Sequence, residues 1–218
     1  MQGANLPDPL YLIPILAGLS LLPFFAVMMT SYVKLVVVLS LLRNALGVQQ
    51  IPPNMVINGL AIILSLYIMN PVITQMHAAV SQVDFTKKDT ATFSKAAGAL
   101  KTPVHDFLLR HSKDRERAFF VDSARRMWPP EQAASVTPDD ILILIPSFVV
   151  SELTSAFQIG FLLYLPFIAI DLIVSNILLA MGMMMVSPMT ISLPFKLLLF
   201  VLLDGWARLI HGLVMTYG

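Results

Sequence analysis

The sequence contains no cysteine, so disulfide bonds, thiolate catalysis and cysteine-bound metals are excluded. Charge is also scarce, because only 12% of the 218 residues are charged whereas 57% are hydrophobic. This balance is not that of a soluble domain. We therefore expect a chain whose apolar surface is covered by lipid or by other subunits.

Motifs for catalysis and cofactor binding are missing as well. The sequence has no GxxxxGK[ST] phosphate loop, no GxSxG turn, no HExxH zinc motif and no glycine fingerprint after a strand. We expect no enzyme activity, no cofactor and no bound metal, and any energy for transport would come from elsewhere. The histidines, which lack the spacing of metal ligands, are His77, His105, His111 and His211.

The few charges are concentrated in one segment. Residues 84–140 contain ten basic and nine acidic side chains, and the rest of the chain has only eight charges. A nucleic-acid or anionic-lipid patch would show one sign of charge. The balance within this segment predicts an ordinary solvated surface.

Long apolar tracts flank this polar segment. The first, residues 10–42, would be about 50 Å long as one helix, which exceeds the hydrocarbon core of about 30 Å, so kinks at Pro14 and Pro23 are expected. No Lys or Arg precedes it, so we expect a retained anchor rather than a cleaved signal peptide. After a turn at residues 49–54, a second helix is expected from about Asn54 to Met69, ending before Pro71.

The remaining segments also favour helices. Within the polar segment, helices are expected at residues 95–100 and 104–126, and Thr137 is expected to be the N-cap of the next helix. The third apolar tract, residues 141–186, is long enough for two passes or a bent hairpin, and a final tract covers residues 191–215. The predicted fold class is all-α, with bent hydrophobic hairpins at residues 1–81 and 139–218 around a polar helical segment at residues 82–138.

Several polar side chains lie inside the apolar tracts. Such groups are expensive at membrane depth and mark functional sites, or they pair with one another in a protein core or between subunits. We favour the second interpretation, since Glu152, Ser151, Ser155 and Gln158 recur at helical spacing as a packing seam. The candidates for buried polar or assembly contacts are Lys34, Glu152, Gln158, Asp171, Lys196 and Asp204.

Three consecutive methionines, Met183 to Met185, form the most unusual local feature. Consecutive residues point in all directions on a helix, so this run is better suited to a loop between Gly182 and Pro188. Methionine side chains are unbranched and adapt to irregular surroundings. By themselves these residues fit core filling and a deformable constriction equally well.

Three long strings resemble the FliP/SctR (YscR) family of type III secretion and flagellar export-apparatus subunits. They are KLVVVLSLLRNALGVQQIPPN at residues 34–54, IPSFVVSELTSAFQIGF at residues 145–161 and MGMMMVSPMTISLPFKLLLFVLLDGW at residues 181–206. The polar segment resembles the family only in general character. The short N-terminus without a signal peptide looks more like the injectisome branch, which serves virulence.

The resemblance implies a homopentamer that joins two other small hydrophobic subunits in the bacterial inner membrane. The implied assembly conducts unfolded protein substrates and extends to the periplasmic side, where the segment 82–138 would lie. In that family a methionine loop from each copy forms a gasket around the closed pore, and Met183, Met184 and Met185 match it.

Two other classes of function compete with this expectation. One is a small secondary transporter or ion channel that uses Lys34, Glu152 and Asp171 as an ion relay, and the other is a purely structural membrane scaffold. The transporter predicts repeated halves or matching broken helices, and the sequence has neither.

Overall fold

The computed structural model describes residues 20–21, 23–48, 51–81 and 90–218, with the backbone alone at residues 90–97 and 99. These residues form helices and no strand, so the all-α prediction is confirmed. A helical stretch at residues 20–21 and 23–28 precedes the labelled helices. The labelled helices are α2 Tyr32–Leu46, α3 Asn54–Ser81, α4 Thr90–His111, α5 Asp114–Met127, α6 Pro130–Ser135, α7 Ile141–Ala180, α8 Pro188–Leu202 and α9 Gly205–Met215.

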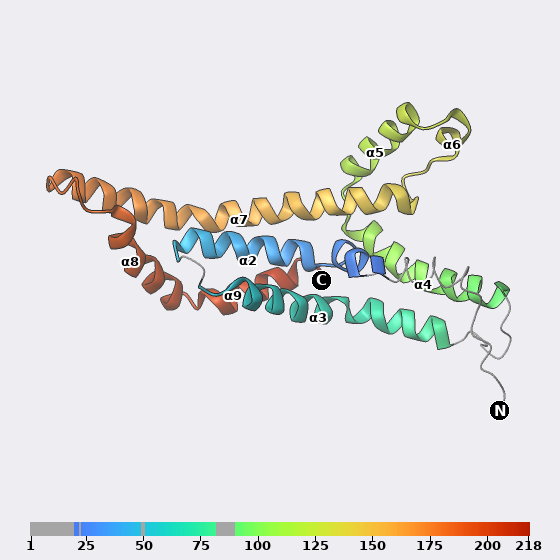
Figure 1. Cartoon of the computed structure of the whole chain (residues 1–218), viewed down its shortest axis with the longest axis horizontal. Coiled ribbons are helices and arrows are strands. Elements are labelled where there is room, and N and C mark those ends of the chain that lie inside the picture. Colours follow the sequence, from blue (N-terminus) through green and yellow to red (C-terminus); the bar gives the residue numbers. More distant parts are fainter. Residues whose placement is uncertain (1–19, 22, 49–50, 82–89) are drawn as a thin grey trace.

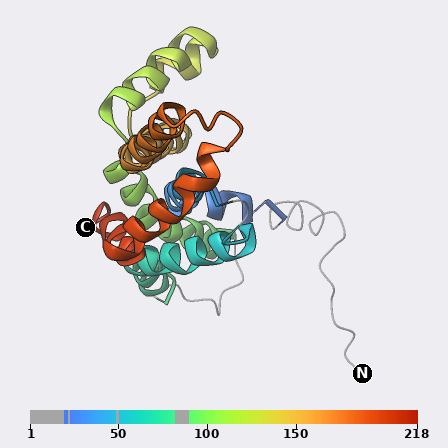
Figure 2. The ribbon, with the colours of Figure 1, turned by 90° about the vertical axis from the view of Figure 1, so that its left-hand side faces the viewer.

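The helices form an elongated trunk with α2 at its centre. α7 lies along one side of α2, and α3 and α9 lie along the other (Figures 1 and 2). Apolar side chains of α2 are fully buried there, among them Leu35, Val38 and Leu39. Because α2 contacts several helices at once, it is the element around which the trunk is packed.

α7 is a single helix of 40 residues, about 60 Å long at 1.5 Å per residue. The prediction of two passes or a hairpin within residues 141–186 is therefore wrong. Pro166 removes one hydrogen bond from this helix, but Gly160 and Phe167 pack on α2 on both sides of it. A Cβ added to Gly160 would lie 2.3 Å from Leu41 Cδ1, so the two helices approach closely there.

α3 begins at Asn54 as predicted but continues through Pro71 to Ser81. The predicted end before Pro71 is wrong because tertiary packing holds the helix together. Met69 and Val72, on either side of the proline, are buried in a cluster with Phe107 and Phe148 from α4 and α7. Burial of these side chains offsets the cost of an internal proline, which is about 3 kcal/mol.

The first apolar tract is broken at residues 29–31, where no proline is present. The hydroxyl of Thr30 accepts a hydrogen bond from the Tyr32 N–H (3.4 Å), and the hydroxyl of Ser31 donates to that of Ser65 (3.1 Å). Such side-chain bonds compete with helical ones. Pro14 and the anchor expected from Leu10 lie outside the described residues.

The polar segment is bent where one helix was predicted. α4 ends at His111 and α5 begins at Asp114, because Lys113 is extended and its N–H donates to the hydroxyl of Ser151 on α7 (2.9 Å). α5 and α6 project from the trunk at the end where α7 begins (Figure 1). The prediction that Thr137 is the N-cap of α7 is also wrong.

Asp140 precedes α7, and its Oδ2 accepts the Thr137 N–H (2.8 Å). Thr137 is therefore outside the helix that it was expected to cap.

α3 and α7 are long and apolar enough to cross a membrane. α8 and α9 pass the same test only when they are taken together as one span. They meet at an angle of 61° around Leu203 and Asp204. Only 11% of the most apolar window of α7 is buried within the chain. Most of that helix therefore needs lipid or another protein chain as a neighbour.

Candidate functional site: two charged contacts and a methionine loop

The first charged contact joins α2 to α7 in the middle of the trunk. Lys34 Nζ lies 3.0 Å from Glu152 Oε1, and both side chains are almost completely buried, with 5% and 3% exposure. An unpaired charge at such a site would cost several kcal/mol, whereas a paired one is tolerated. The contact therefore fixes the relative position of the two helices.

The C-terminal residues complete the surroundings of this pair. The hydroxyl of Tyr217 donates to Glu152 Oε2, and Lys34 Nζ donates to the hydroxyl of Thr216 (3.4 Å). The ammonium group also lies 3.9 Å from the centre of the Tyr217 ring, as in a cation–π contact. The pair is thus formed by α2 and α7, and the segment that follows α9 contributes a further hydrogen bond to each charge.

Aromatic rings of α4 cover the Tyr217 ring. Phe107 is stacked on it at 6.3 Å between ring centres, and His111 meets its edge at 5.0 Å. Burial, together with the positive charges of Lys34 and Arg110, lowers the pKa of His111 to about 4. His111 is therefore neutral at pH 7 and acts as an aromatic packing group.

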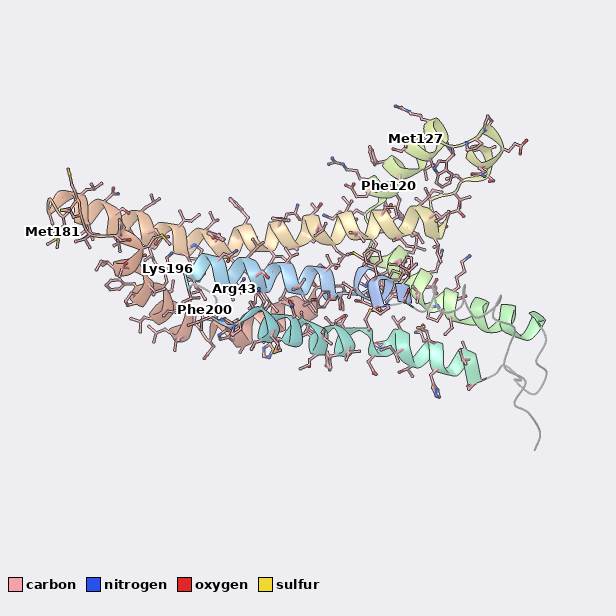
Figure 3. All side chains as sticks on the ribbon, viewed as in Figure 1. Arg43, Phe120, Met127, Met181, Lys196 and Phe200 are labelled. Atoms are coloured by element: carbon pink, nitrogen blue, oxygen red, sulfur yellow. The ribbon has the colours of Figure 1, made fainter. Side chains whose placement is uncertain are left out.

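The second charged contact joins α7 to α8 and α2 (Figure 3 labels Lys196). Lys196 Nζ lies 2.6 Å from Asp171 Oδ2 and 3.2 Å from the carbonyl oxygen of Ala45. That carbonyl is in the last turn of α2, which lacks helical partners and carries a partial negative charge. The hydroxyl of Ser192 donates to Asp171 Oδ1 (2.6 Å).

The end of α2 is shaped by Gly47, which has a left-handed conformation (φ 74°). A Cβ at this position would lie 3.8 Å from Lys196 Nζ. Arg43 in the last turn donates to Asn54 Oδ1 (2.5 Å) and so ties α2 to the start of α3. Lys196 is buried, but the side chain of Asp171 is 35% exposed.

The structure places the six predicted polar residues in two groups. Lys34 with Glu152, and Lys196 with Asp171, form the two contacts above. Gln158 and Asp204 are exposed on the surface of the single chain. Asp204 has a left-handed backbone (φ 49°) at the bend between α8 and α9.

One serine of the predicted seam, Ser151, contacts a neighbouring element. Ser151 donates to the Ser147 carbonyl (2.7 Å) and accepts the Lys113 N–H, so it connects α7 with the bend between α4 and α5. Gln158, the last residue of the predicted seam, is exposed and lies beside exposed Phe157 and Phe161.

The methionine loop, residues 181–187, connects α7 to α8 at the tip of their hairpin (Figures 1 and 3). Gly182 adopts a left-handed conformation (φ 73°), and its N–H and that of Met183 bond back to the carbonyls of Leu179 and Leu178. This is the Schellman ending of a helix, which requires a residue that tolerates positive φ.

The methionine side chains of this loop are exposed, two of them almost completely. The exposed fractions are 42% for Met183, 82% for Met184 and 101% for Met185. Core filling within one chain is therefore not their role.

Several contributors to these sites were not identified from the sequence. Tyr217 and Thr216 follow the last apolar tract and belong to no pattern that would link them to Glu152. Ser192 could have been found, because it precedes Lys196 by four residues and so shares its helix face. Among the described residues, no three His, Cys, Asp or Glu side chains gather as metal ligands.

Comparison with known proteins identifies the family. The model of the FliP family matches residues 15–213. The chain belongs to the FliP family. A member from Yersinia pestis, Yop proteins translocation protein R, is 60% identical over 216 residues, covering 98% of this chain and 99% of the relative.

Other FliP family relatives agree in length and in the kind of name. Virulence protein YscR of Salmonella typhimurium is 51% identical over 214 residues, with 98% and 99% of the two chains covered. Hypersensitivity response secretion protein HrcR of Ralstonia nicotianae is 51% identical over 208 residues, with 94% and 96% covered. The predicted resemblance to the type III secretion branch of the family is thereby confirmed.

Proposed function

We propose that this chain is a core subunit of a type III secretion export apparatus and forms part of the pore that conducts unfolded proteins across the bacterial inner membrane. The names of its relatives, which describe translocation and secretion proteins, support the export role. The observation that carries the pore role is the methionine loop, because three large apolar side chains lie exposed at the tip of a long hairpin.

The loop has the chemistry of an adaptable seal. Methionine side chains repack around different neighbours at little cost, so a ring of such loops would close on itself or around a passing polypeptide without demanding a particular sequence. We propose that Met183, Met184 and Met185 form this gasket in the idle pore. The Schellman turn at Gly182 ends α7 directly before these residues, and Met184 and Met185 are the most exposed of the three.

The outer surface of the trunk supports an oligomer. Exposed apolar side chains follow α7 on the face away from α2, for example Phe157, Phe161 and Leu165. Exposed patches of this extent mark interfaces with protein or lipid. We propose a homopentamer that also contacts two other small hydrophobic export subunits, with Gln158 and Asp204 available for contacts between chains.

The arrangement of polar and apolar parts suggests an orientation. α5 and α6 project from the end of the trunk that is remote from the methionine loop (Figure 1). We propose that residues 82–138 lie on the periplasmic side, between hydrophobic units formed by residues 1–81 and 139–218. In this proposal the chain contributes a conduit and no catalysis.

The mass of the complex purified in mild detergent tests this function. A mass of five copies, with or without the two partner subunits, is expected. A monomer or dimer as the final state would exclude the pentameric pore. That result would favour the alternative function, a transporter that uses Lys34, Glu152 and Asp171 as an ion relay.

A further inference from the structure

A cavity of about 430 Å³ lies between α7, α8 and α9, with Leu42 of α2 at its inner end. Its walls are almost entirely apolar, with side chains such as Leu163, Phe167, Phe200 and Leu209. The space exists because α9 turns away from α8 by 61°. Its volume is in the range of small-molecule pockets, which is about 300–1,000 Å³.

Two glycines define one side of this cavity. A Cβ on Gly205 would lie 2.2 Å from the Phe200 ring, so α9 can begin this close to α8 only with glycine there. Gly212, two turns later, also lines the cavity, and a Cβ added to it would have no atom within 4 Å. The space beside Gly212 is therefore open and able to accept an apolar chain.

The cavity has a positively charged edge. Arg208 is the only charged side chain among the described residues that line it. Arg208 is exposed. Within the described part of the chain its guanidinium group forms no hydrogen bond or ion pair, and it does not pair with the neighbouring carboxylate of Asp204. Trp206, which is 38% exposed, does not line the cavity, but its ring contacts the edge of Phe200, which does.

We propose that this cavity binds one acyl chain of an anionic phospholipid, whose phosphate group pairs with Arg208. An apolar cavity with few polar groups cannot orient a polar solute, but it accommodates a hydrocarbon chain. A guanidinium group forms two parallel hydrogen bonds with phosphate oxygens. Arg and Trp side chains also concentrate at the depth of lipid headgroups.

The surroundings favour lipid over a soluble ligand. α7, and α8 with α9 taken as one bent span, are among the elements apolar enough to lie in a bilayer, and these helices form the cavity. Lipid is then the molecule present at the highest concentration at its entrance. This inference is independent of the export role and of the methionine loop, which lies at the tip of the hairpin.

Quenching of Trp206 fluorescence by brominated acyl chains tests the proposal. The full chain would carry Trp128→Phe, so that Trp206 is the sole reporter, and would be titrated in detergent with dibrominated phosphatidylglycerol or with phosphatidylcholine of the same chains. We expect saturable quenching with a preference for phosphatidylglycerol. Since one exposed ion pair contributes at most about 1 kcal/mol, that preference should be about fivefold in half-saturating concentration.

Two matched variants separate the cavity from lipid around the trunk. Gly212→Leu fills the open space and should abolish saturable quenching, whereas Gly59→Leu, at a helical glycine of α3 that also has no neighbour within 4 Å, should leave it unchanged. Arg208→Gln should keep the quenching and lose the preference for phosphatidylglycerol.

Equal quenching in the Gly212→Leu and Gly59→Leu variants would overturn the proposal, because it would show only a surrounding lipid layer. Wild-type quenching that is equal for the two lipids would also contradict it, since Arg208 would then select no headgroup. The associated complex would be titrated in the same way. If brominated lipid no longer quenched Trp206 there, and the purified complex contained no lipid, a second copy of the chain would occupy the cavity instead.

Discussion

Glu152 and the methionine loop belong to the same hairpin but have opposite surroundings. Glu152 is buried and bonded to Lys34 and Tyr217, whereas Met184 and Met185 have almost no contacts within the chain. The first arrangement stabilises the folded chain. The second adds little to the stability of the single chain, because Met184 and Met185 are exposed. Mutations along α7 and α8 should therefore divide into those that change stability and those that change only permeability.

The largest loss of stability is expected from Glu152→Ala. Removal of the carboxylate leaves the charge of Lys34 buried with no opposite charge beside it, which typically costs about 3–5 kcal/mol. Thermal unfolding of the detergent-purified chain should show it, together with a lower yield of oligomer. The double variant Lys34→Met with Glu152→Leu, which removes both charges, should recover most of the loss. If Glu152→Ala were as stable as the wild type, the contact would not hold α2 against α7.

Gly160→Ala should be the next most damaging change. The new Cβ would lie 2.3 Å from Leu41 Cδ1 and 3.2 Å from Leu41 Cβ, so α2 and α7 must separate. Overpacking of this kind costs about 1–3 kcal/mol. Gly59→Ala is the matched control, because it has free space and should stabilise its helix by up to about 1 kcal/mol. Equal unfolding temperatures for the two variants would contradict the close approach.

Asp171→Asn should cost less than Glu152→Ala. The Asp171 side chain is 35% exposed, so solvent screens its charge, and Lys196 keeps the Ala45 carbonyl as a partner. A loss of about 1 kcal/mol in urea unfolding is expected. A loss as large as that of Glu152→Ala would mean that the second contact is buried by a further part of the chain.

A pH-dependent contribution is expected from His111. Its pKa is about 4 in the folded chain and near 6.5 when unfolded, so the unfolded chain binds more protons between these values. Stability should fall as the pH decreases from about 6.5 to 4, and His111→Phe should reduce that fall. Since His111 is only partly buried, the difference should be about 1 kcal/mol. Unfolding temperatures of the two proteins across this pH range provide the comparison.

The smallest effect on stability is expected from replacing Met183, Met184 and Met185 by alanine. These side chains are exposed, and exposed substitutions usually change stability by less than about 0.5 kcal/mol. The unfolding temperature of the single chain should therefore match that of the wild type. A clear destabilisation would show that the loop packs against its own chain.

The sequence predicted which segments are helical better than it predicted where each helix begins and ends. Periodicity and proline positions revealed the helical class, the start of α3 and the methionine loop. The end of α3 and the continuity of α7 depend on neighbours such as Phe107 and Leu41, which are distant in sequence. The same limit applies to the charged contacts. Lys34 and Glu152 were recognised as unusual, but their pairing with each other, and with Tyr217, depends on packing that no local pattern contains.

The permeability of the assembled complex tests the central claim most directly. Bacterial inner membranes that contain wild-type complex, or complex with Met183 to Met185 replaced by alanine, would be compared for leakage of small ions at equal amounts of oligomer. The proposed gasket predicts a low leak in the wild type and a marked increase in the triple variant. An unchanged leak, with the oligomer intact in both, would contradict it.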